Sequence, residues 1–153
     1  MTSPARAGSR PSSAAIIRAS DIGTVVIVVS AVATLLLPDP LNVVVVVVSC
    51  ILFVLGCAAF LWALAIAADR SRTDAIDIGG TFLLLGTAPR PIQWRLLGAL
   101  GIQVVVTVAS AAARPFTNQA FTVLGAMFGL GLTGLWGARF GTFGPRRTDD
   151  DDS

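Results

Sequence analysis

A row of polar side chains interrupts one of the apolar stretches of the sequence. The row consists of Gln103, Thr107, Ser110 and Arg114. Their spacing of four, three and four residues places them on one face of an α-helix. Inside a membrane such a face points toward other helices, where amides and hydroxyls bond across helices or line a path for a polar substrate. We expect interhelical hydrogen bonds from Gln103 and Thr107, and a substrate path is the alternative.

A second polar group flanks the two short breaks in the apolar pattern. Its members are Asp39, Asn42, Arg114, Asn118 and Gln119. These residues converge at one mouth of the protein if the two breaks lie on the same side of the membrane. The simplest interpretation is an ion pair between Asp39 and Arg114, which at an exposed site contributes little to stability. Whether the group binds anything stays open.

The residue types that most enzymes need are absent. The chain has no His, its nine acids are all Asp, and its eleven basic residues are all Arg. It therefore lacks an imidazole base and the usual mixed ligand sets for metals. Asp74 and Asp77 lie three residues apart, but with no His, Glu or phosphate-binding loop we interpret them as solvated surface acids. The sequence predicts no enzyme, no metal site and no cofactor.

The composition indicates a membrane protein from a high-GC bacterium. Hydrophobic residues make up 54% of the 153 residues, charged residues only 13%, and the mean hydropathy is +0.79. Ala, Gly, Val and Arg are used heavily, whereas Lys and Tyr are missing. Such a chain is too apolar for a water-soluble domain of this size. We expect it in the inner membrane, with no affinity for nucleic acid.

Four apolar runs predict an all-α membrane protein with four transmembrane helices. We expect helices at about residues 20–37, 41–68, 95–113 and 119–139, inside a domain that spans 16–145. Only Pro38-Asp39-Pro40 separates the first two runs, and Pro115-Phe116-Thr117-Asn118-Gln119 separates the last two. Such short connections predict two antiparallel hairpins. Aligning Ala33 and Asn42 with Ala109 and Asn118 gives a constant offset of 76, a faint sign of a parallel repeat.

The two ends of the chain are expected to be disordered. Residues 1–15 are rich in Ser, Pro, Ala and Arg, and residues 146–153 end in four Asp and a Ser. A cleaved signal peptide with a processing site near Ser30-Ala31-Val32-Ala33 is the competing interpretation of the N-terminal region. We favour a membrane helix, because the apolar run continues through Leu37.

The placement of arginine predicts the orientation. Ten arginines fall in the N-terminal region, in residues 69–95, or at and after the end of the last helix, and only Arg114 falls on the opposite side. By the positive-inside rule both termini are cytoplasmic. Trp62, Trp94 and Trp136 lie near the same predicted ends, where indole rings favour the interface between membrane and water.

Residues 69–94 between the two hairpins read as an interfacial linker. Its apolar core, 76–88, is too short to span a membrane and contains Asp77. Ile78, Phe82 and Leu85 recur at helical spacing, although Ile76 and Ile78 also alternate as a strand would, so helix and strand both stay open. We expect these residues to dip into the headgroup region, where arginines bind anionic lipid headgroups. The predicted interfacial residues are Phe82, Leu85, Trp94 and Arg95.

Small residues form a ridge along the last helix. The ridge consists of Gly125, Gly129, Thr133, Gly137 and Gly141, each four residues from the next. Such a row lets two helix backbones approach closely. Two partners are equally expected: the third transmembrane helix of the same chain, or a second copy or another membrane protein.

Part of the chain resembles a known group of proteins. The segment PRPIQWRLLGALGIQVVVTVASAAARPFT, followed by GLWGARFG, is similar to small integral membrane proteins of actinobacteria to which no activity is assigned. The resemblance implies four helices in a bacterial inner membrane and implies no activity. The leading hypothesis is an interaction, assembly or accessory subunit that works through the glycine ridge and the linker. The alternative is a small transporter or channel that works as an oligomer.

Overall fold

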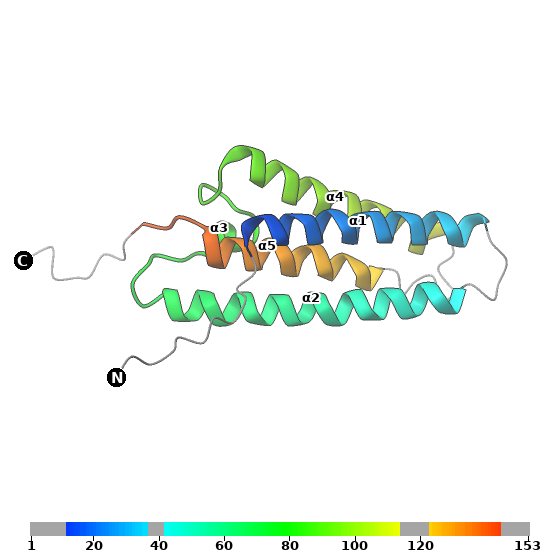
Figure 1. The fold of residues 1–153 in the computed structure, drawn as a ribbon, viewed down its shortest axis with the longest axis horizontal. Helices are drawn as coiled ribbons and strands as arrows, with labels where there is room; N and C mark the ends of the chain where they lie inside the picture. The colour runs from blue at the N-terminus through cyan, green and yellow to red at the C-terminus, as the bar shows by residue number, and fades with distance from the viewer. Residues whose placement is uncertain (1–11, 37–41, 114–122, 145–153) are drawn as a thin grey trace, which may run out of the picture.

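The computed structural model of the chain describes residues 12–36, 42–113 and 123–144. Figure 1 shows long helices side by side and a short helix at one end. The long helices are α1 (Ser13–Leu36), α2 (Asn42–Arg70), α4 (Arg90–Ala113) and α5 (Ala126–Phe140), and the short one is α3 (Ile78–Phe82). Within the described ranges, four stretches are long and apolar enough to cross a bilayer. The protein is therefore an all-α, multi-pass membrane protein.

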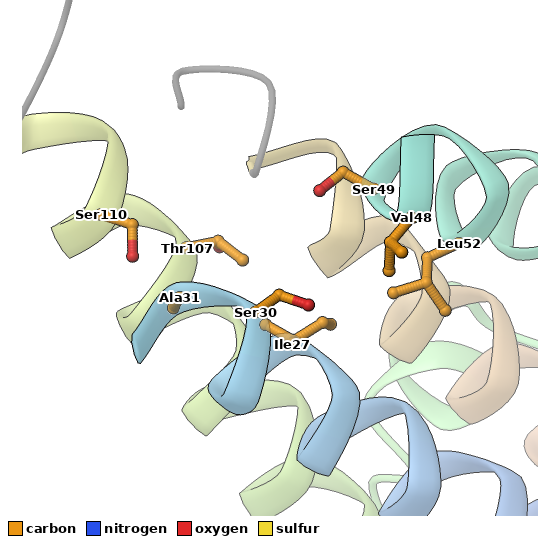
Figure 2. Close-up of a pocket in the computed structure, with 8 residues that line it drawn as sticks. All are labelled: Ile27, Ser30, Ala31, Val48, Ser49, Leu52, Thr107 and Ser110. Carbon is orange, nitrogen blue, oxygen red and sulfur yellow. The ribbon is translucent and has the colours of Figure 1, made fainter. Parts of the chain in front are cut away.

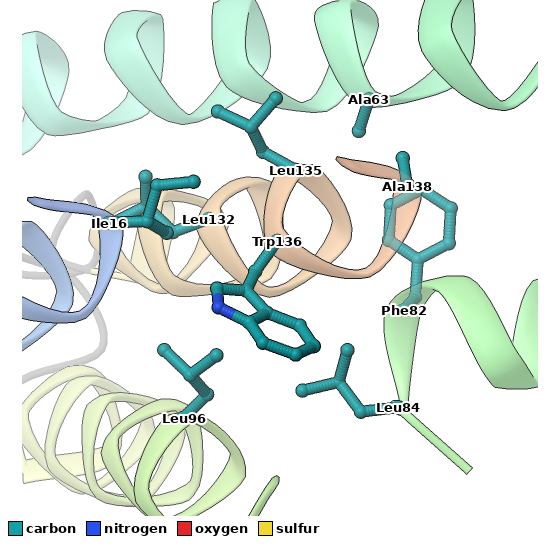
Figure 3. Close-up of a cluster of buried hydrophobic side chains, with 9 residues drawn as sticks. All are labelled: Ile16, Ala63, Phe82, Leu84, Leu96, Leu132, Leu135, Trp136 and Ala138. Atoms are coloured by element: carbon teal, nitrogen blue, oxygen red, sulfur yellow. The ribbon is translucent and has the colours of Figure 1, made fainter. Parts of the chain in front are cut away.

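The centre of the bundle is α5, which contacts each of the other helices (Figure 1). Every residue from Gly131 to Ala138 is buried. A helix that is enclosed on all sides needs small side chains where neighbouring backbones come close, and α5 supplies glycine at 131, 134 and 137. Figure 3 shows Leu132, Leu135 and Trp136 of α5 surrounded by apolar side chains from the other helices.

The two hairpins are antiparallel, as predicted, but consecutive helices are not the main packing partners. α2 packs most extensively against α5, and α1 packs next most extensively against α4, whereas α1 and α2 make few contacts. In Figure 1, α1 and α4 run in one direction, and α2 and α5 run in the other. The first helices of the two hairpins thus lie together, as do the second helices. The two hairpins are not equivalent, because α5 contacts every other helix whereas α2 packs mainly against α5.

The helix boundaries differ from the predicted ones mainly at the N-terminal ends. α1 begins at Ser13 instead of about residue 20, because Ser12 caps it through a hydrogen bond from the Ala15 amide (3.3 Å) and Ile16 is buried in the core. α4 begins at Arg90 and carries Pro91 in its first turn, where proline is favoured. α5 begins at Ala126, after a short 3₁₀ turn at residues 123–125.

We call the end of the bundle with α3 and the C-terminus of α2 the linker end, and the opposite one the turn end. Several predicted features lie outside the described residues. These are Asp39, Arg114, Asn118, Gln119, the side chain of Asn42, most of the N-terminal arm and the acidic tail. The expected outer cluster and the Asp39 to Arg114 ion pair therefore stay predictions.

Candidate functional site

The polar row on α4 lies inside the bundle. Gln103 is fully buried and Thr107 is nearly so, whereas Ser110 is half-buried. The Gln103 side chain donates a hydrogen bond from Nε2 to Thr24 Oγ1 of α1 (2.7 Å). Thr107 donates to the carbonyl oxygen of Gln103 (2.7 Å), and Ser110 donates to that of Val106 (2.7 Å). Among the described residues, the row thus bonds to another helix through Gln103 and to the backbone of α4 through Thr107 and Ser110.

Two buried polar atoms at this interface have no hydrogen-bond partner among the described residues. They are Gln103 Oε1 and Ser20 Oγ. A Cβ placed at Gly129 would overlap Gln103 Oε1, so this oxygen lies against the bare backbone of α5. A short glycine contact of this kind permits a weak Cα–H···O interaction but no conventional hydrogen bond. In an apolar interior an unpartnered amide oxygen destabilises its surroundings.

A small cavity lies beyond this point, toward the turn end (Figure 2). Its free volume is about 10 Å³. Hydroxyl groups from three helices line it: Ser30 of α1, Ser49 of α2, and Thr107 and Ser110 of α4. The remaining lining residues are Ile27, Ala31, Val48 and Leu52. A volume of this size holds about one water molecule and is far too small for a substrate path.

The predicted glycine ridge is used inside the chain. Gly125 lies against Ile27 of α1, Gly129 against Gln103 and Leu100 of α4, and Gly137 against the carbonyl oxygen of Thr81 in α3. Thr133 is fully buried. Of the two expected partners, the same chain is therefore the one that covers the ridge. Gly125, Gly129 and Gly137 thus lie against three different helices of the chain itself.

The linker does not lie on the membrane surface as a separate segment, because its centre is inserted into the linker end of the bundle. Phe82 is only 8% exposed, stacks on Phe60 of α2 with ring centroids 4.9 Å apart, and occupies the space beside Gly134. The expectation that Phe82 faces lipid is wrong, because Gly134 leaves a gap that the phenyl ring fills. The open question of helix or strand resolves to a short helix, Ile78–Phe82, whose N-terminus Asp77 caps (Gly80 N to Oδ2, 2.8 Å).

A tight turn follows α3, and its three consecutive leucines differ in burial. Leu84 is fully buried in the hydrophobic cluster although its φ is +56°, a left-handed conformation that non-glycine residues seldom adopt. Burial of a leucine side chain contributes about 1.5–3 kcal/mol, enough to offset a left-handed penalty of about 1–2 kcal/mol. Its neighbours Leu83 and Leu85 point outward and are about half exposed.

Arg70 connects the linker to α5 through hydrogen bonds and an ion pair. Its guanidinium donates to the carbonyl oxygens of Ala138 (2.8 Å) and Gly141 (3.2 Å) at the C-terminus of α5. The same group forms an ion pair with Asp74 (2.9 Å) and lies over the ring of Phe143. A cation at this position satisfies carbonyl groups that a helix end leaves unpaired and complements the helix dipole. Asp74 thus has a structural partner in Arg70, and Asp77 has one in the Gly80 amide.

Backbone hydrogen bonds complete the attachment of the linker. The Ala75 amide donates to Gly144 O (2.9 Å), and the Thr142 amide donates to Thr87 O (3.0 Å). Thr87 in turn donates from its buried hydroxyl to Gly80 O (2.6 Å). The linker and the segment after α5 therefore hold each other in place.

One apolar set remains displayed on this fixed backbone. Ile78 is 80% exposed, Leu85 57% and Leu83 47%. We call these three residues the linker surface. Near them along the chain, Trp94 of α4 is 76% exposed. Trp94 and Leu85 therefore face outward, and their position at a membrane interface stays a prediction.

Two other side chains are placed differently from the sequence analysis. Trp136 is buried in the core, and its indole Nε1 donates to Ser13 Oγ (2.8 Å), so it joins α5 to α1 instead of facing the membrane interface. Arg95 donates to Asp21 of α1 (2.6 Å) in a half-exposed ion pair. This pair joins α4 to α1, which lie side by side.

Thr24, Arg70 and Leu84 make contacts that were not predicted from the sequence. The spacing of Ser20 and Thr24 could have indicated one of them, because two polar residues four apart share one face of a helix. Arg70 was counted only as a positive charge, and Leu84 was one leucine in a run of three. Among the described residues no group of three His, Cys, Asp or Glu side chains is placed to hold a metal ion.

Comparisons with protein families, curated proteins and solved structures find nothing that matches this chain.

Proposed function

We propose that the protein is an assembly or accessory subunit of a bacterial inner membrane, and that it binds a partner protein through the linker surface. The observation that carries the proposal is the display of Ile78, Leu83 and Leu85 on a backbone that Arg70 and the buried Phe82 hold in place. Exposed apolar groups on a fixed scaffold are typical of docking surfaces. In a flexible loop, by contrast, the leucines would be free to pack against the bundle.

The charge pattern supports a cytoplasmic position for this surface. Arg70, Arg72, Arg90 and Arg95 all lie at the linker end or next to it, and the positive-inside rule places such an end in the cytoplasm. In this orientation both termini are cytoplasmic. Trp94 and the exposed Arg90 then lie at the headgroup level, where we propose that they bind anionic lipids. The resemblance to actinobacterial membrane proteins supports the proposed source.

The orientation is tested by chemical labelling. Cys50 and Cys57 are first replaced by alanine, and Arg72→Cys then supplies the only thiol, in the exposed part of the linker. We expect a membrane-impermeant maleimide to label this cysteine in inverted vesicles and not in intact spheroplasts. Labelling in spheroplasts would reverse the proposed topology.

The docking role is tested by purification from native membranes after crosslinking. We expect a protein to copurify in a fixed ratio with the wild type and to be lost from the double variant Ile78→Ser, Leu85→Ser. Arg72→Ser is the matched control, since Arg72 is exposed in the same linker but outside the linker surface. Retention of the partner by the double variant, or no stoichiometric partner with the wild type, contradicts the proposal.

A small transporter or channel is the second candidate, and the buried amide and hydroxyls of α4 favour it. Such polar groups mark ion and substrate pathways in many membrane proteins. In a single copy, however, the cavity beside them holds only about 10 Å³, so a pathway requires an oligomer. This candidate predicts proton or monovalent-cation flux into liposomes that Gln103→Ala abolishes. Liposomes with no flux above the protein-free control contradict it.

A further inference from the structure

The hydroxyl-lined cavity between α1, α2 and α4 has the size and the chemistry of a binding site for one water molecule. It lies about 10 Å along α2 from the first residue of that helix, within the part of the bundle that crosses the membrane. Its four hydroxyls are those of Ser30, Ser49, Thr107 and Ser110 (Figure 2). Its volume of about 10 Å³ is close to that of one water-sized sphere.

The hydrogen-bonding capacity of the lining residues matches that of one water. Ser110 uses its hydroxyl proton on the carbonyl oxygen of Val106, so toward the cavity it can only accept. The hydroxyls of Ser30 and Ser49 make no hydrogen bond among the described residues, so they can donate to an occupant. These three hydroxyls therefore offer two donors and one acceptor, and about three hydrogen bonds are typical of a buried water molecule.

We propose that one water molecule is bound in this cavity and joins α2 to the α1 and α4 pair. Direct contacts between α1 and α2 are sparse, and Ser49 is a buried polar residue on the face of α2 that meets the cavity. If the cavity were empty, the hydroxyls of Ser30 and Ser49 would face it with no hydrogen bond to the described residues, which is unfavourable in hydrocarbon surroundings. A cation does not fit these requirements, because the lining contains no carboxylate to balance its charge.

The water is detected by nuclear Overhauser effects from water to methyl groups in methyl-labelled protein in detergent micelles. We expect water contacts at Ala31, Ile27 and Val48, which line the cavity and have no exchangeable side-chain protons of their own. Thr73, exposed in the linker, reports bulk water. If Thr73 contacts water and the three cavity methyls do not, the cavity is dry and the proposal fails.

Variants separate a bound water from general hydration of the micelle. Ser49→Val fills the cavity with methyl groups and should abolish the water contacts at Ala31 and Ile27. Ser20→Ala is the matched control, because it removes a buried hydroxyl of α1 that is not in the cavity lining, and it should keep them. Water contacts that survive Ser49→Val would overturn the site. Contacts that disappear when sodium replaces choline in the buffer would identify a cation as the occupant and equally overturn it. The wild-type spectrum decides the question even if Ser49→Val does not fold.

Discussion

The backbone carbonyl of Gly56 in α2 lies directly against the Cα of Gly131 in α5. A Cβ at Gly131 would overlap that carbonyl oxygen, and a Cβ at Gly56 would overlap the backbone of Met127 and Phe128. The two glycines therefore set the distance of the most extensive helix pair in the bundle. Close backbone approach of this kind brings many weak contacts together along both helices.

Gly131→Ala should destabilise the protein, whereas Gly98→Ala should not. At Gly131 the added methyl requires the two helices to separate, and overpacking of this kind costs about 1–3 kcal/mol. Gly98 of α4 has open space around its Cα, so alanine there should be neutral or add up to about 1 kcal/mol of helix stability. Unfolding in mixed micelles by sodium dodecyl sulfate measures both. Equal effects would contradict the close contact of Gly56 with Gly131.

Thr24 and Gln103 should be energetically coupled. Thr24→Val leaves the Gln103 amide without its partner, while Gln103→Met keeps the volume and removes the amide. In a double-mutant cycle we expect a coupling energy of about 0.5–2 kcal/mol, the range for hydrogen bonds between membrane helices. The same unfolding assay gives the four stabilities. Additive effects of the two substitutions would mean that the bond contributes nothing.

Arg70→Met should loosen the linker without unfolding the long helices. The substitution removes the hydrogen bonds to Ala138 and Gly141 and the ion pair with Asp74. Hydrogen bonds to a charged group contribute about 1.5–3 kcal/mol each when buried, and the partial exposure of Arg70 reduces that, so we expect a total loss of about 1–3 kcal/mol. Hydrogen–deuterium exchange should rise in residues 71–89 by tenfold or more. Arg72→Met is the control and should leave exchange unchanged, because Arg72 is exposed.

Phe82→Ala and Leu85→Ala distinguish an inserted linker from a superficial one. Phe82 fills the space beside Gly134, so its truncation leaves a cavity and should cost about 3–5 kcal/mol. Leu85 is exposed, so its truncation should change stability by less than about 0.5 kcal/mol. Thermal unfolding in micelles compares the two variants. Similar small losses would mean that Phe82 lies on the surface.

The helices and their direction could be predicted from the sequence because both depend on properties of short segments. The length of each apolar run predicts whether it can span the membrane, and the prolines at residues 38–40 predict the break between the first two helices. The spacing of Gln103 and Thr107 placed both on one face without information about other helices. The identity of the neighbour was not predictable in this way, since Thr24 becomes the partner of Gln103 only when α1 lies beside α4.

The contacts of the linker could not be predicted from the sequence, because each depends on a residue in another helix. The burial of Phe82 depends on a gap at Gly134, which lies in another helix, and neither residue alone indicates the match. The role of Arg70 depends on the position of the carbonyl groups at the end of α5. Long-range complementarity of this kind comes from the packing of non-consecutive helices and has no periodic pattern in one segment.

The central position of α5 also has a consequence for biosynthesis. Translation proceeds from the N-terminus, so α1, α2 and α4 leave the ribosome before the helix that they surround. Until α5 arrives, Gly56 and Gln103 face the bilayer or one another without their native neighbour. The bundle can close only when the last helix enters between helices that are already inserted. A chain that ends before residue 126 therefore keeps the pairing of α1 with α4 but lacks the helix that joins α2 to them.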